Sequence, residues 1–134
     1  MATPRQIVAD QIQADNETFK VRAFPYFPSE VRGEAVISVW RTDVGTSPDS
    51  PNLLRHSLQI QVYAGATLEE KAEATLDELL DAVLLSLQRL TSIGGVTSER
   101  VVFGDESSGQ FTGWKILCYA DSANVYKQTV LSEG

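Results

Sequence analysis

The chain has 134 residues and a formal net charge of −7, from 11 Lys and Arg against 18 Asp and Glu. A single cysteine, Cys118, excludes an intrachain disulfide, and a single histidine, His56, makes histidine-based catalytic and zinc sites hard to build. The length and the 43% of hydrophobic residues predict one globular domain over residues 1–134. Because no apolar run approaches the roughly 20 residues of a membrane span and no signal-like segment opens the chain, we expect no membrane segment and no secretory signal.

The first elements are a helix and a short strand. Thr3 followed by Pro4 is typical of a helix start, because a hydroxyl at the N-cap and a proline at the first helical position are both favoured there. A thin apolar stripe that includes Val8 and Ile12 predicts a helix over residues 4–15. Residues 18–23 alternate with period two and predict a short strand.

The middle of the chain predicts two strands with a loop between them. Residues 35–41 are apolar at both parities, which indicates a central strand covered on both faces. Residues 43–52 are rich in Gly, Pro and Ser, which favours a long exposed loop. Residues 57–63 alternate cleanly and predict a strand.

The clearest helix is predicted over residues 67–90. It opens with the capping box of Thr67 and Glu70, carries acids in its first turns, and shows apolar residues at steps of three and four. Gly94 and Gly95 are interpreted as its end. Leu85 lies off the apolar stripe, beside Glu78 and Asp81; it is either a lone exposed leucine or a contact with a neighbouring subunit.

The last third of the chain predicts strands. Residues 100–103 and 111–119 form a hairpin across a turn at 104–109, a second turn is placed at 121–122, and a final strand is considered at 125–131. The expected fold class is therefore α+β: a single mixed or mostly antiparallel sheet of about five strands, with one long helix packed on one face and a short N-terminal helix.

A search for reactive groups finds no catalytic, cofactor or metal site. His56 shares parity with the core-facing Leu58, which favours a partly buried histidine with a hydrogen-bond partner. Cys118 lies in an apolar strand and is expected to be a buried, inert thiol. The helix acids favour a solvated face over a cation site, because calcium loops present their oxygens from a turn. We therefore expect a protein that is not an enzyme and uses no cofactor.

The charge is concentrated in the second half of the chain. Residues 67–134 carry five basic and eleven acidic residues. Affinity for phosphates comes from Lys and Arg, so this surface disfavours sequence-specific binding of DNA or RNA. The acidity either keeps the domain soluble or lines a surface past which DNA slides without sticking.

The whole pattern resembles the tail terminator (tail completion) proteins of long-tailed bacteriophages, especially those of actinobacterial hosts. The likeness rests on residues 2–10 (ATPRQIVAD), on residues 36–41 (VISVWR) with the loop and strand up to residue 63, and on the acidic helix with its ATLDELLDAVL run. The resemblance covers nearly the full chain. It implies a structural virion protein without catalytic residues or a cofactor.

The resemblance also implies partners and a location. Similar proteins form a hexameric ring on the end of the tail tube, stop tail polymerisation and offer a surface to head-completion or connector proteins. Double-stranded DNA passes through the lumen without specific binding. The implied location is the head-proximal end of the virion tail, with assembly in the host cytoplasm.

A ring needs two different patches on each subunit. The expected patches are the outward face of the acidic helix and a sheet edge or loop on the opposite flank. The candidate interface residues are Leu85, Asp81, Glu78, Val44, Pro48, Pro51 and Asn52.

Three alternatives stay open. The first is a head–tail connector or minor tail protein with a similar small fold. The second, of another class, is a small-molecule-binding or enzymatic α+β domain with a pocket near His56 and Tyr63. The third is a generic bacterial interaction module.

Overall fold

A computed structural model describes residues 3–24, 35–64, 69–91, 93–105 and 109–123. The part of the chain it describes holds two helices and a five-stranded mixed sheet, which makes the fold α+β. In chain order the elements are α1 (Pro4–Asp15), β1 (Lys20–Arg22), β2 (Ala35–Thr46), β3 (Leu53–Ala64), α2 (Glu69–Gln88), β4 (Ile93–Asp105) and β5 (Gly109–Ala123). Neither described helix is long and apolar enough to cross a bilayer.

The strands lie in the order β1-β2-β3-β5-β4. β1 runs parallel to β2, while the other three pairings are antiparallel. β3 is the central strand, and its Leu58 lies opposite Arg41 on one side and Cys118 on the other. The β4–β5 pairing confirms the predicted hairpin, with Phe103 opposite Phe111.

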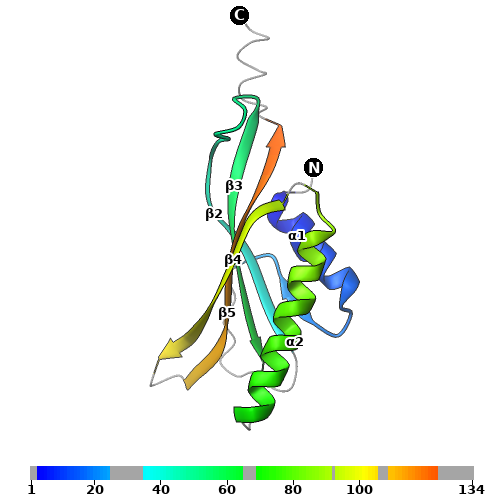
Figure 1. Cartoon of the computed structure of the whole chain (residues 1–134), viewed down its shortest axis with the longest axis vertical. Coiled ribbons are helices and arrows are strands. Elements are labelled where there is room, and N and C mark those ends of the chain that lie inside the picture. The colour runs from blue at the N-terminus through cyan, green and yellow to red at the C-terminus, as the bar shows by residue number, and fades with distance from the viewer. Residues whose placement is uncertain (1–2, 25–34, 65–68, 92, 106–108, 124–134) are drawn as a thin grey trace, which may run out of the picture.

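Both helices cover the same face of the sheet, as Figure 1 shows. The main core lies between them and this face, and it includes Val8 and Ile12 of α1, Val83 and Leu87 of α2, and alternate residues of the strands. Asp15, at the end of α1, joins the two helices. It accepts hydrogen bonds from Ser86 Oγ at 2.8 Å and from Arg89 Nη1 at 2.6 Å.

The prediction that residues 35–41 are covered on both faces is confirmed for the centre of the strand. Ile37 and Val39 are fully buried on the face with the helices. Val36 and Ser38, of the other parity, are also buried. On this second face Val36 packs with Tyr63, whose hydroxyl donates to Gln61 Oε1 at 2.7 Å. Burial raises the pKa of Tyr63 to about 12.

The first helix has the predicted bounds, and residues next to its start explain where it begins. Thr3 is the N-cap, its hydroxyl accepts from the backbone N–H of Gln6 at 3.4 Å, and Pro4 occupies the first turn. Three predicted features lie partly or wholly outside the described residues: the capping box of α2, the middle of the turn at 104–109, and the strand considered at 125–131.

Three predictions were wrong, because each assigned residues of a strand to a loop, a turn or a helix end. Residues 43–46 continue β2, so the loop shortens to residues 47–52. Asp121 and Ser122 form no turn but pair within β5 with Arg55 and Leu54. Gly94 and Gly95 do not end the helix, which stops at Gln88, and instead lie in β4 at a register shift. In all three cases cross-strand hydrogen bonds override the local preference of Gly, Asp and Ser for turns.

Candidate interaction surfaces

The sheet extends well beyond the helices at one end. The distal halves of β2 and β3 and the end of β5 project past the helices as a three-stranded arm (Figure 1). We call this feature the arm and define it as residues 41–57 with residues 119–123. Its register continues to the tip, where Thr46 lies opposite Leu54 and Leu53 lies opposite Ala123.

Hydrogen bonds fix the turn at the tip of the arm. The backbone N–H of Ser47 donates to the carbonyl of Leu53 at 2.9 Å, which closes the turn. Two serine hydroxyls accept from the backbone two residues later: Ser47 Oγ from Asp49 at 3.2 Å, and Ser50 Oγ from Asn52 at 3.3 Å. Ser47 is buried, so the turn has its own packed interior.

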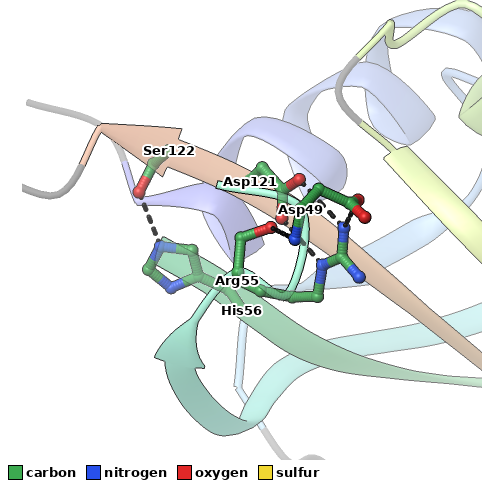
Figure 2. A network of polar contacts seen from close by, with 6 residues as sticks. Asp49, Arg55, His56, Asp121 and Ser122 are labelled. Carbon is green, nitrogen blue, oxygen red and sulfur yellow. Dashed lines mark hydrogen bonds and ion pairs between the residues drawn. The ribbon is translucent and has the colours of Figure 1, made fainter. Parts of the chain in front are cut away.

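Ion pairs brace one face of the arm, as Figure 2 shows. Arg55 and Asp121 are cross-strand partners, and Arg55 donates to both carboxylate oxygens of Asp121, from Nε at 3.0 Å and from Nη2 at 3.2 Å. Its Nη2 also donates to Asp49 Oδ2 at 2.8 Å. These carboxylates raise the pKa of Arg55 further above its ordinary value. One guanidinium therefore connects the tip turn, β3 and β5 in a bidentate geometry.

An aromatic stack continues this brace toward β4. The Arg55 guanidinium lies 3.7 Å from the centroid of the Tyr119 ring. On the neighbouring strand, Gly94 and Gly95 lie so close to the ring that an added Cβ would meet its atoms at 2.7 Å and 2.5 Å, respectively. Gly95 has a φ of 60°, in the left-handed region. The two glycines therefore make room for Tyr119 rather than ending a helix.

On the opposite face of the arm from Arg55, the His56 ring on β3 contacts residues of β5 and β2. Its Nε2 lies 2.7 Å from Ser122 Oγ, and its Nδ1 lies 3.3 Å from Arg41 Nη1 (Figure 2 shows the serine contact). Because Arg41 can only donate, Nδ1 accepts and Nε2 carries the proton that is donated to Ser122. Burial lowers the pKa of His56, and the charge of Arg41 lowers it further while Asp121 opposes the shift.

The predicted reading of His56 as a buried, hydrogen-bonded histidine is confirmed, since its side chain is 5% exposed. His56 and Tyr63 lie on opposite faces of β3, so they do not share a pocket. Cys118 is buried in the core, and burial raises the pKa of its thiol to about 11. Among the described residues no cluster of three or more His, Cys, Asp or Glu could hold a metal ion.

The structure divides the seven predicted interface residues between two surfaces. Four of them lie on the arm: Val44 on β2, and Pro48, Pro51 and Asn52 in the tip turn. All four are exposed, and the Val44 side chain is 42% exposed. The arm therefore still gathers the four residues that the sequence placed in a long loop.

The other three lie on α2. Glu78, Asp81 and Leu85 follow one another at helical spacing and are exposed, with Leu85 at 54%. We call them, together with the exposed Asp77, the acidic face of α2. The helix turns this face away from the core residues Val83 and Leu87.

Sequence reasoning missed the residues that stiffen the arm. Arg55, Tyr119, Asp121 and Ser122 were not singled out as a group, because they meet only in the register of β3 with β5. Arg55 and Asp121 are 66 residues apart in the chain. The sequence showed alternation only from residue 57 onward, which leaves out Arg55, and it assigned the partner Asp121 to a turn.

Comparisons with known proteins give little. No family model matches the chain, and no curated protein matches it. Among solved structures it is similar to the PVC sheath/tube terminator of an extracellular contractile injection system in its extended state. The identity is 13%, and the TM-score is 0.41. The match covers 92% of this chain but only 59% of the other.

Proposed function

We propose that this chain is a structural protein of a tailed particle, which caps the tail tube as a ring, stops tail polymerisation and joins the tail to its head. In this proposal the protein acts through its surfaces and not as an enzyme. The ring is hexameric, the particle is a bacteriophage, and double-stranded DNA passes through the lumen without specific binding. The support comes from the surfaces of the chain itself.

The arm is the observation that carries the proposal. It projects past the helices, yet it is braced on both faces by Arg55 and His56 and closed at its tip by Ser47. An exposed extension that is held in one shape meets a partner at low entropic cost. The exposed Val44 and the tip prolines then offer an apolar contact to the tube or the connector.

The acidic face of α2 gives a second, different surface. It lies on a helix whose opposite side fills the core, whereas the arm lies beyond the helices (Figure 1). Subunits that use two different patches form head-to-tail contacts, and these form a ring when the rotation from one subunit to the next closes. The sequence resemblance to tail terminators agrees with such an assembly.

Electron microscopy of growing tail tubes tests the proposal. Tube subunits of the same particle are polymerised with and without the purified chain, and tube length and tube ends are scored. We expect added protein to stop growth and to leave a ring at one tube end. Tubes that keep growing without a cap, or a ring found only on the head connector, would contradict termination.

Two leucine variants sharpen this experiment. Leu85→Arg places a charge on the acidic face of α2, and we expect it to reduce capping. The matched control is Leu117→Arg, because Leu117 is also exposed, at 41%, but lies on β5. Normal capping by Leu85→Arg would remove Leu85 from the ring interface.

A further inference from the structure

Three carboxylates on α2 have no partner among the described residues. Asp77, Glu78 and Asp81 are exposed, and none forms an ion pair or a side-chain hydrogen bond in the part of the chain that the structure describes. They lie within four residues of one another and next to the exposed Leu85. Like charges at this spacing on one helix repel each other, so the group gains from a cation supplied from outside.

Two arginines elsewhere have no carboxylate partner within the described part of the chain. Arg5 on the first turn of α1 and Arg41 on β2 line a depression of about 190 Å³, together with Thr3 and Pro4. Arg41 contacts the His56 ring but no acid, and Arg5 forms no described ion pair or side-chain hydrogen bond. Both side chains are exposed.

Three other cations of the described residues do have carboxylate partners. Arg55 binds Asp49 and Asp121, Arg89 binds Asp15, and Lys115 lies 3.5 Å from Glu99. In a protein with a net charge of −7, acids are plentiful. Two guanidinium groups that converge on one depression without an acid therefore mark a surface that a partner completes.

We propose that this depression binds the acidic face of α2 of a second copy of the chain. The inference rests on the proposed function and names the contact that would close its ring. Glu78 and Asp81 of one copy reach Arg5 and Arg41 of the next. Within one copy, the described residues show no ion pair or hydrogen bond between the two patches, so in this proposal the patches meet between copies, in a head-to-tail arrangement.

Charge favours a second copy over nucleic acid as the occupant. Two arginines neutralise few phosphates, and tight binding of DNA needs several such contacts. The overall negative charge of the chain repels a polyanion at longer range. The carboxylates of Glu78 and Asp81 carry the complementary charge, and each copy of the chain supplies two of them for two arginines.

A charge swap tests the pairing. One variant carries Arg5→Glu and Arg41→Glu, and a second carries Glu78→Lys and Asp81→Lys. Their self-association is compared with that of the unchanged chain by native mass spectrometry and sedimentation. The control carries Asp10→Lys and Glu17→Lys, which makes the same charge change as the second variant on exposed acids outside both patches. Circular dichroism confirms that each variant is folded.

Each variant alone is expected to associate at least about tenfold more weakly, because like charges then face each other across the contact. An equimolar mixture of the two variants is expected to recover association, since each supplies what the other has lost. A single chain with all four changes is expected to recover it as well. The control is expected to associate like the unchanged chain.

The outcomes separate the two proposals. If the unchanged chain and both variants associate equally, or if the mixture does not recover, the pairing is wrong while the ring can still stand. If the unchanged chain does not associate, alone or on tubes, the ring proposal fails and this contact fails with it. Binding of double-stranded DNA that is lost with the arginine changes, without any effect on self-association, would also overturn the pairing.

Discussion

His56 is neutral in the folded protein because of where β3 places it. Its ring is buried between Arg41 and Ser122, and one of these neighbours is a cation. Protonation would place a second positive charge within reach of Arg41 and would turn Nδ1 from an acceptor into a donor facing a donor. The position therefore disfavours the imidazolium form.

This placement predicts a loss of stability in mild acid. The pKa of His56 is lowered from 6.5 in the folded chain, so the unfolded chain binds the proton first as the pH falls. The free energy of unfolding decreases below pH 6.5 and levels off below the folded pKa, by about 1.4 kcal/mol for each unit of pKa lowering. This pH dependence is measured by urea unfolding between about pH 7.5 and about pH 5, for the unchanged chain and for His56→Gln. Equal pH dependence of both proteins would contradict the assignment.

Gly95 shows how a residue can be required by its neighbour. Its φ of 60° and the Tyr119 ring beside it both exclude a side chain. Gly45 on β2 offers a contrast, because an added Cβ there meets nothing within 4 Å. The same residue type therefore has different reasons to be present at the two positions.

The two glycines predict opposite costs of substitution. Gly95→Ala is expected to lower the free energy of unfolding by about 1–3 kcal/mol, because of backbone strain and displacement of Tyr119. Gly45→Ala is expected to change the free energy of unfolding by less than about 1 kcal/mol. The change is an increase if alanine adopts the strand backbone at this position without strain. Thermal and urea unfolding of both variants check this; similar losses at the two positions would contradict the role of Tyr119.

Among the elements, the strands depend on partners distant in the chain. β2 and β3 each span 12 residues, and their distal halves lack the cover of helices that the proximal halves have. What keeps the distal halves together is the network of Arg55 with Asp121 and Asp49, and of His56 with Ser122 (Figure 2). The arm is thus held by polar contacts, while the body of the sheet is held by its core.

This division predicts that the arm can be loosened on its own. Arg55→Gln is expected to speed amide hydrogen exchange at the tip, at Ser47 and Leu53, by several-fold, while amides of the core strands keep their protection. The control Lys115→Gln removes a single longer contact with Glu99 and is expected to leave the tip unchanged. Uniform acceleration over the whole sheet would show that the arm and the body open together.

At the scale of the whole molecule, the charges are unevenly satisfied. Arg55 and Arg89 lie in ion pairs that stabilise one copy, whereas the acidic face of α2 and the Arg5–Arg41 depression do not. When the acidic face of one copy meets the Arg5–Arg41 depression of another, as proposed, assembly depends on charge far more than folding does.

Salt separates these two effects. Self-association is expected to weaken several-fold as salt rises from about 0.1 M to about 1 M, where the Debye length shortens from about 10 Å to about 3 Å. The free energy of unfolding of the separate chain is expected to change much less, because its core is apolar. Sedimentation and unfolding at matched salt concentrations measure both. Association that strengthens with salt would indicate an apolar contact instead.

The sequence by itself determined the local elements and the class of the fold. Thr3 and Pro4 set the start of α1, helical spacing predicted α2, and period-two alternation predicted the centre of β3, because caps and amphipathic periods act over a few residues. It also indicated which residues of the arm and of α2 are exposed.

Only the tertiary structure decided where the strands end and what holds the arm. Asp121 and Gly94 have local preferences for turns, yet both pair with residues of strands far along the chain, and Gly95 lies at a register shift within β4. The bond of Arg55 to Asp121 depends on the register of two strands that are 66 residues apart. Such a register follows from the packing of the whole sheet, and no short segment of sequence contains it.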